Sequence, residues 1–298
     1  MRIASNSISD NIVRQIQQLG SQQARLQNQV STGQRIFQPE DDPSAMGRVL
    51  NLETEGRQLA QYSRNADHAM EVSQATFAGL QGLKKISDRG TEIGTLGTGV
   101  VSPESLHAYS SEVGQLIEQA FQAANTKLGS DYLYAGTAVA TPPFVATRDA
   151  NGQITSVAYA GNSDRAEIPL SSTSNLAPNT SGETNQGIRD FINQLIAMRD
   201  GLASGNQAGV GAAQAGLISA EDALVSALGE HGGIQTRIEA SKSQQTDLTN
   251  SIDSLISKET DADLPSTIVK LTQTQTAYQA ALQSAANIMK ISLLDYLR

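Results

Sequence analysis

The sequence predicts a mainly α-helical protein. The helices of both chain ends form an elongated antiparallel bundle or coiled coil, and a small β-rich domain is inserted between the helical parts. Three observations predict this fold class. Apolar residues recur in alternating steps of three and four near both ends, the spacing of a helix that packs along another helix. Only 4% of the 298 residues are aromatic and none is Trp, which suits long, lightly packed helices. A central stretch rich in Pro, Gly and Asn is typical of short strands and turns.

The first predicted helix carries a seam, meaning the row of residues that faces a partner helix. The N-terminal seam comprises Ile8, Ile12, Ile16, Leu19, Gln23, Leu26 and Val30. Gly33 is expected to end this helix, and the prolines of STGQRIFQPEDDPSAM prevent regular continuation. Asp42 is expected to cap the next helix, which begins near Pro43. A cation site at Asp41 and Asp42 is the weaker alternative, because the residue spacing of a calcium loop is absent.

Two further helices are predicted before the central stretch. Apolar periodicity between Val49 and Leu80 indicates the second helix, and the third runs to about Leu128. The intervening Gly-rich GTLGTGVVSPES is interpreted as a turn, because Gly94, Gly97 and Gly99 are too loosely spaced for a nucleotide loop and no strand precedes them. Within it, Ser102 followed by Pro103 has the pattern of an N-cap and a first helical position.

The β-rich insert is predicted over residues 137–185. Its short β-prone runs are broken by Pro, Gly and Asn, and Asn151-Gly152 is a strong signal for a hairpin turn. Helical spacing resumes at Ile188. We expect Gly232-Gly233 to break the helical part before a further periodic helix between Ile234 and Leu255.

The last predicted helix begins after KETDADLPS, with Pro265 in its first turn. Asp261 and Asp263 are expected to favour the positive N-terminus of this helix, with metal binding as the weaker alternative. The C-terminal seam and apolar end comprise Leu271, Gln275, Tyr278, Leu282, Ala285, Ile288, Ile291, Leu293 and Leu294.

This layout predicts three structural parts. Residues 1–40 and 256–298 form a terminal coiled-coil polymerisation domain, 41–136 and 186–255 a helical rod domain, and 137–185 the small surface insert. The terminal seams are weak, since Gln23 and Gln275 stand where a stable coiled coil would have Leu, Ile or Val. We therefore expect the terminal helices to order only against neighbours.

Composition and motifs argue against several classes of protein. The formal net charge is −9 and basic residues are not clustered, so nucleic acid is not an expected partner. No run of about 20 apolar residues that could span a membrane is present, and no cleaved signal peptide is visible at the N-terminus. Cysteine is absent and the three histidines are scattered, with solvent-facing helix positions expected for all three. No set of acid, base, nucleophile or metal ligands converges, so neither an enzyme nor a cofactor is predicted.

Two stretches resemble the signatures of the flagellin superfamily. The first is LQNQVSTGQRIFQPEDDPSA, and the second consists of GGIQTRIE and DADLPSTIVKLTQTQTAYQAALQ. The matching residues are Ser31, Thr32, Gly33, Arg35, Ile36, Asp41 and Asp42 in the first, and Gly233, Arg237, Glu239, Asp261, Asp263, Leu271, Gln275, Gln279 and Ala280 in the second. The resemblance leaves the central insert unmatched. Within the superfamily, the opening MRIASN, the run ANTKLGSDYLYAGT and the ending SLLDYL are more similar to hook–filament junction proteins than to filament flagellins.

The resemblance implies a structural adaptor of the bacterial flagellum. Its implied location is extracellular, in a ring layer of identical copies at the hook–filament junction, after type III export without a cleaved signal peptide. The implied partners are the hook-side junction protein (FlgK), flagellin and a cytoplasmic FlgN-like export chaperone. Arg35 would pair across a subunit boundary or cap carbonyl groups. A minor flagellin and, less favoured, a secreted coiled-coil adhesin or effector are the alternatives.

Overall fold

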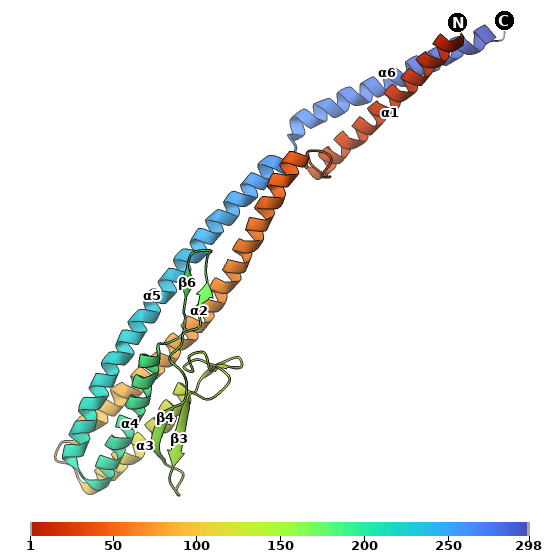
Figure 1. The fold of residues 1–298 in the computed structure, drawn as a ribbon. Helices are drawn as coiled ribbons and strands as arrows, with labels where there is room; N and C mark the ends of the chain where they lie inside the picture. Colours follow the sequence, from red (N-terminus) through yellow and green to blue (C-terminus); the bar gives the residue numbers. More distant parts are fainter. Residues whose placement is uncertain (1, 297–298) are drawn as a thin grey trace. The chain divides into compact units, whose positions relative to one another are not determined.

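The structure is a computed structural model that describes the backbone of residues 2–296 and the side-chain surroundings of residues 10–287. Six helices make up most of this part of the chain (Figure 1). They are α1 (Arg2–Thr32), α2 (Pro43–Gly97), α3 (Pro103–Ala124), α4 (Gly182–Ser204), α5 (Gln207–Thr260) and α6 (Leu264–Tyr296).

Six short strands lie between α3 and α4 and form three separate antiparallel pairs. The strands are β1 (Lys127–Leu128), β2 (Asp131–Tyr132), β3 (Phe144–Arg148), β4 (Ile154–Tyr159), β5 (Ile168–Pro169) and β6 (Asn175–Leu176). β1 pairs with β2, β3 with β4 and β5 with β6. The predicted fold class, mainly helical with a small β-containing region, is confirmed.

The chain divides into two compact units. One comprises Met1–Arg57 and Leu248–Arg298, and the other comprises Gln58–Asp247. The limits of these units fall inside α2 and α5, at other residues than the sequence-based division. That three-part division stays a prediction.

The unit of residues 58–247 holds the main hydrophobic core. Buried side chains of α2, α3, α4 and α5 meet there with those of the β3–β4 hairpin, and its fully buried members include Leu80, Ile117, Phe144, Phe191 and Leu217. α3 lies against α4, and β4 packs on α4 as well. Burial of such side chains from water is the main favourable contribution to folding.

An amide on α4 fixes the hairpin to that helix. The Asn193 side chain accepts a hydrogen bond from the Val157 N–H at 3.0 Å and donates one to the Val157 carbonyl at 2.9 Å. Both backbone groups of this strand residue are therefore satisfied from α4, as a partly buried strand edge requires.

Local turn and cap signals are confirmed where they depend on neighbouring residues. Ser102 caps α3 by accepting a hydrogen bond from the Ser105 N–H, and Pro103 begins the helix. Gly33 directly follows α1 with a φ of 74°, a conformation that favours glycine. In the β3–β4 turn, Gly152 has a φ of 82° and the Asp149 carboxylate accepts the N–H groups of Asn151 and Gln153.

Two glycine-based predictions are wrong. Gly94 and Gly97 lie within the last turns of α2, where an added Cβ would come within 2.7 Å of Met198 and 2.4 Å of Leu202. These glycines allow α4 to approach α2 closely. Gly232-Gly233 does not interrupt α5, which is continuous through both residues. Each glycine inside a helix costs about 1 kcal/mol relative to Ala, which packing on either side offsets.

Candidate assembly site

The terminal helices α1 and α6 lie side by side, as the two seams predict (Figure 1). Leu26 is buried, and a second group of predicted seam residues is half-buried: Ile12, Ile16, Leu19, Val30, Leu271 and Tyr278. The Tyr278 ring rests against Gly20, where an added Cβ would be 3.6 Å from its Cε2. The predicted residues Ile8, Ile288, Ile291, Leu293 and Leu294 lie outside the residues whose side chains the structure describes.

The inward face of α6 differs from the predicted seam at its far end. Leu282 is 44% exposed, whereas the neighbouring Ala281 and Ala285 are half-buried. Two of the inward positions, Thr267 and Thr274, are buried hydroxyl residues. An α-helix has 3.6 residues per turn and drifts against a strict seven-residue repeat. This drift explains why Ala281 takes the inward place that the repeat gave to Leu282.

α6 also carries an apolar stripe that α1 does not cover, which we call the outer stripe. It begins with the apolar side chains of Ile268 and Val269, which are 49% and 56% exposed. A shallow groove of about 650 Å³ lies along it and is lined by Val269, Thr272, Gln273, Thr276, Ala277 and Ala280. Between Leu264 and Asn287 the only charged residue is Lys270. Large exposed apolar surface of this kind is typical of interaction sites.

The two chain breaks that flank the terminal helices are joined by backbone hydrogen bonds. The Arg35 N–H donates to the Thr260 carbonyl at 2.6 Å, and the Ala262 N–H donates to the Gly33 carbonyl at 2.8 Å. Gln34 and Asp261 thereby form an isolated antiparallel bridge. The end of α1 and the start of α6 are thus fixed to each other through main-chain atoms.

Arg35 adds side-chain contacts at this junction. Its Nη2 donates to the Glu259 carbonyl at the end of α5 at 2.8 Å, and its Nη1 lies 3.3 Å from Oδ2 of Asp42. The next residue, Ile36, is buried. Of the two roles expected for Arg35, capping of a carbonyl is therefore present within the single chain.

Asp41 and Asp42 both accept backbone hydrogen bonds. The Asp41 carboxylate accepts the N–H groups of Phe37 and Gln38, at 3.0 Å each, and these bonds lower its pKa. Asp42 accepts the Ala45 N–H at 3.0 Å, which is the main cause of its lowered pKa. Because α2 begins at Pro43, the prediction that Asp42 is an N-cap is confirmed.

Asp261 does not act at the start of α6 as predicted. Its carboxylate accepts hydrogen bonds from the hydroxyls of Ser257 and Thr260, in the last turn of α5. Ser257 lies one turn before Asp261, and Thr260 is its neighbour in the chain. Asp263 directly precedes α6, and its carbonyl accepts the Thr267 N–H at 2.9 Å.

No local sequence pattern indicates the ion pair between Arg48 and Glu259. Nε and Nη2 of Arg48 donate to the two carboxylate oxygens at 2.9 and 2.8 Å. The bidentate contact raises the pKa of Arg48 and lowers that of Glu259. The partners are 211 positions apart in the chain, so no local pattern can pair them.

No group of three or more potential metal ligands occurs among the described residues. Within the same part of the chain, none of the helices combines the length and apolar character that crossing a bilayer requires. What the junction and the outer stripe offer is hydrogen bonding, helix capping and apolar surface, which are means of holding helices and subunits together.

Comparisons with known proteins identify relatives of this arrangement. Residues 3–138 match the family described as the bacterial flagellin N-terminal helical region. A comparison with curated proteins found no match. Among solved structures, a protein described as a flagellar hook-associated protein from Vibrio parahaemolyticus is similar over 74% of this chain and 100% of its own, with a TM-score of 0.67 and 19% identity.

Two further structures have the same relation to the chain. FlgL from Bacillus cereus is similar over 70% of this chain and 99% of its own, with a TM-score of 0.59 and 17% identity. Hook-associated protein 3 from Legionella pneumophila covers 70% and 98%, with a TM-score of 0.59 and 12% identity. At such identities the likeness concerns the fold. Residues 3–138 are therefore similar to the bacterial flagellin N-terminal helical region, and the chain shares the fold of the solved FlgL and hook-associated proteins.

Proposed function

We propose that this chain is a non-enzymatic structural adaptor of the bacterial flagellum that joins the hook to the flagellin filament. The proposal rests on the fold shared with three solved flagellar hook-associated proteins, including FlgL and hook-associated protein 3, over 98–100% of the length of those chains. The adaptor would form a ring layer of identical copies between the first hook-associated protein and flagellin. It would reach this extracellular position by flagellar export, held before that by a cytoplasmic chaperone.

Neighbouring copies are proposed to meet through the terminal helices. Most of the described seam residues pack between α1 and α6 of one chain, so they are not free to contact a second copy. The outer stripe remains available on α6. The outer stripe is nearly uncharged, so it suits a partner surface that is also uncharged. The outer stripe of a second copy is such a surface. The apolar end from Ile291 onward is proposed to belong to the same contact.

A minor flagellin is the second candidate function. The match of residues 3–138 to the flagellin N-terminal region favours it. The two candidates differ in position, since an adaptor occupies one short zone next to the hook and a filament subunit is distributed along the filament. Immunogold labelling of an epitope-tagged chain distinguishes them. Label confined to the hook end of the filament supports the adaptor, and label along the filament overturns it in favour of a flagellin.

Loss of the C-terminal residues tests the role of the terminal helices. A chain that ends at Lys290 lacks Ile291–Arg298 and is expected to keep its helix content but to fail to enter flagella. Circular dichroism measures the first property, and immunoblots of purified hook–basal-body complexes measure the second. Normal incorporation of the truncated chain would contradict the proposal that the terminal residues mediate assembly.

Two valines provide a matched test of the outer stripe. Val269 on α6 is 56% exposed and Val145 on β3 is 53% exposed. Because only Val269 lies on the proposed contact, Val269→Asn should lower incorporation several-fold and Val145→Asn should leave it unchanged. Incorporation is measured by the same immunoblot. Equal incorporation of the two variants would exclude the outer stripe and leave the adaptor role itself intact.

A further inference from the structure

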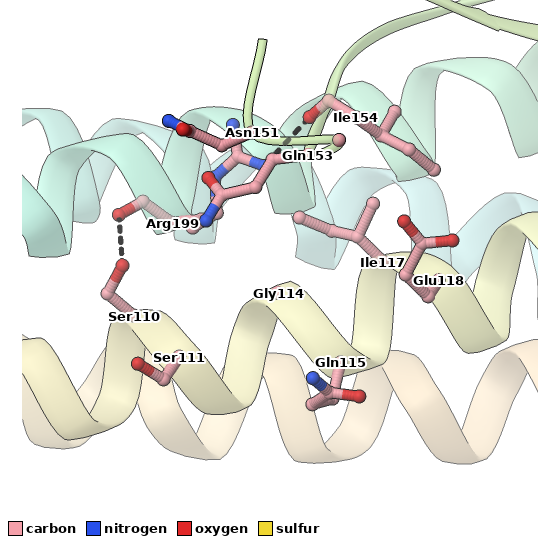
Figure 2. A pocket seen from close by; sticks show the side chains of 11 residues that line it. Ser110, Ser111, Gly114, Gln115, Ile117, Glu118, Asn151, Gln153, Ile154 and Arg199 are labelled. Atoms are coloured by element: carbon pink, nitrogen blue, oxygen red, sulfur yellow. Dashed lines mark hydrogen bonds between the residues drawn. The ribbon is translucent and has the colours of Figure 1, made fainter. Parts of the chain in front are cut away.

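A polar recess of about 320 Å³ lies in the unit of residues 58–247. Its lining comes from one face of α3, the tip of the β3–β4 hairpin and one residue of α4 (Figure 2). Figure 2 shows Gln153 and Arg199 on one side of this space and the helix surface at Ser110 and Gly114 on the other. The volume is sufficient for one small ring-shaped ligand.

Gly114 leaves the floor of the recess open. A Cβ added there would meet a single side-chain atom, Cδ of Arg199, at 4.0 Å. No neighbouring group therefore requires glycine at this helical position, although glycine costs the helix about 1 kcal/mol relative to Ala. The effect of glycine at position 114 is therefore to leave open space above the helix.

The hairpin tip that covers the recess is held in place. Arg148 donates to the Gly152 carbonyl at 2.7 Å and pairs with Glu118 of α3, with 2.9 Å between Nη2 and Oε2. The Asp149 carboxylate accepts the N–H groups of Asn151 and Gln153 at 2.9 and 2.8 Å. A site whose walls are already ordered loses little entropy when a ligand binds.

Arg199 supplies unused hydrogen-bond donors to the recess. Its side chain is only 8% exposed. Nε and Nη2 contact the Asp200 carboxylate, and Nη1 donates to the Ile154 carbonyl at 2.7 Å. An arginine has five N–H donors. One N–H on each terminal nitrogen thus has no acceptor among the described residues, at a depth where an unmade hydrogen bond is costly.

The charges around the recess are balanced. Arg199 is paired with Asp200, and Glu118 is paired with Arg148. An anionic ligand is disfavoured, because the charge of Arg199 is already neutralised by the nearby Asp200 carboxylate. A cationic ligand is disfavoured because it would lie next to the buried Arg199 guanidinium. The amides of Asn151 and Gln153 offer both donors and acceptors, which complement hydroxyl groups. Apolar wall is limited to Ile117 and Ile154, both 1% exposed.

We propose that this recess binds one ring of a neutral polyhydroxylated ligand, a hexose unit of a glycan. The ring hydroxyls accept hydrogen bonds from the free N–H groups of Arg199 and exchange hydrogen bonds with the Gln153 amide. The ring lies over Gly114, where a side chain would displace it. This binding is independent of the adaptor role.

Titration with simple sugars followed by amide NMR tests the proposal. The probes are methyl glycosides of glucose, galactose and mannose, each compared with glucuronate and glucosamine. At least one neutral glycoside is expected to cause saturable shifts at Gly114, Gly152 and Gln153, with weaker effects from the charged sugars. Absence of saturable shifts at these residues for all three neutral glycosides, or tighter binding of a charged sugar, overturns the proposal.

Variants connect binding to the recess. Gly114→Leu fills the space and Gln153→Ala removes the amide, so each should weaken the binding of that glycoside at least tenfold. Gly229→Leu is the matched control, because Gly229 is an exposed helical glycine with no atom near its added Cβ. Unchanged affinity in a folded Gly114→Leu chain contradicts the proposal. Because Gln153 is exposed, Gln153→Ala keeps the test decisive if Gly114→Leu fails to fold.

Discussion

His231 is the residue whose environment differs most from expectation. It was predicted to face solvent but is 1% exposed, with Nδ1 3.3 Å from the Ser73 hydroxyl and Nε2 without a partner among the described residues. A signal was present in the sequence. Leu224, Ala227, His231, Ile234 and Ile238 follow steps of three, four, three and four. The assumed break at Gly232-Gly233 hid this continuity.

Burial gives His231 a pH-dependent effect on stability. Desolvation lowers its pKa, while nearby Glu230 raises it and Arg165 lowers it. The unfolded chain takes up the proton at the ordinary value of 6.5, and the folded chain does so only at lower pH. Lowering the pH below about 6.5 therefore favours the unfolded state. We expect the urea midpoint of unfolding to fall between pH 7.5 and pH 5.5.

Two substitutions assign this pH dependence to one residue. His231→Gln has no titrating group at the site, so its urea midpoint should change much less over the same pH range. His68→Gln, at an exposed position of α2, should keep the wild-type behaviour. If both variants follow the wild-type pH profile, burial of His231 is not the cause.

At the scale of elements, the glycines of α2 have opposite roles that sequence position does not reveal. A Cβ at Gly79 would lie 2.2 Å from the hydroxyl of buried Tyr134, which donates to the Thr76 carbonyl at 3.2 Å. A Cβ at Gly82, less than one turn away, would meet no atom within 4 Å. One glycine is therefore required by packing, and the other only weakens the helix.

This contrast predicts opposite effects of the same substitution. Gly82→Ala should raise the free energy of unfolding by up to about 1 kcal/mol, because alanine favours the helix. Gly79→Ala should lower it by about 1–3 kcal/mol, because the Tyr134 ring must shift in a close-packed core. Urea denaturation followed by circular dichroism measures both changes. A stabilised Gly79→Ala chain would show that Tyr134 moves aside without cost.

Helix ends and turns could be predicted from the sequence where residues close by in the chain determine them. The end of α1 at Gly33, the cap at Ser102 and the turn at Asn151-Gly152 were predictable, because each is determined by residues within a few positions. Gly94 and Gly97 were misassigned because their role depends on α4, more than 100 positions later. The β1–β2 and β5–β6 pairs are two residues long, too short for a periodic signal.

At the scale of the whole molecule, the two units differ in how much apolar surface each buries. Within the described part of the unit formed by 1–57 and 248–298, the buried apolar residues are Leu26, Ile36, Ala45, Val49 and Ile252. The unit of residues 58–247 contains the main core and a second cluster around Ile238. Because apolar burial dominates folding free energy, we expect the terminal unit to open first.

Limited proteolysis tests this difference. Brief digestion with subtilisin should leave a resistant fragment whose ends lie near Arg57 and Leu248, identified by mass spectrometry. The terminal fragments should be lost at least tenfold faster than the resistant one. Early cleavage within residues 60–240, with intact terminal helices, would contradict the expected order.

For the candidate assembly site, the sequence predicted the pairing of the terminal helices and the cap at Asp42. It did not predict the Arg48–Glu259 ion pair or the contact of Asp261 with the end of α5. Both depend on where the two chain breaks meet, and that position is a tertiary property. The outer stripe was missed for a related reason, since a repeat of three and four selects one face of α6 and ignores the rest.

The bridge between Gln34 and Asp261 joins parts of the chain that are synthesised far apart in time. A ribosome releases α1 first and α6 last, yet each of these helices has the other as its packing partner. The earliest part of the chain must therefore remain unpaired until nearly every other residue has been made. Throughout synthesis its apolar side chains are accessible to any cellular factor that binds them.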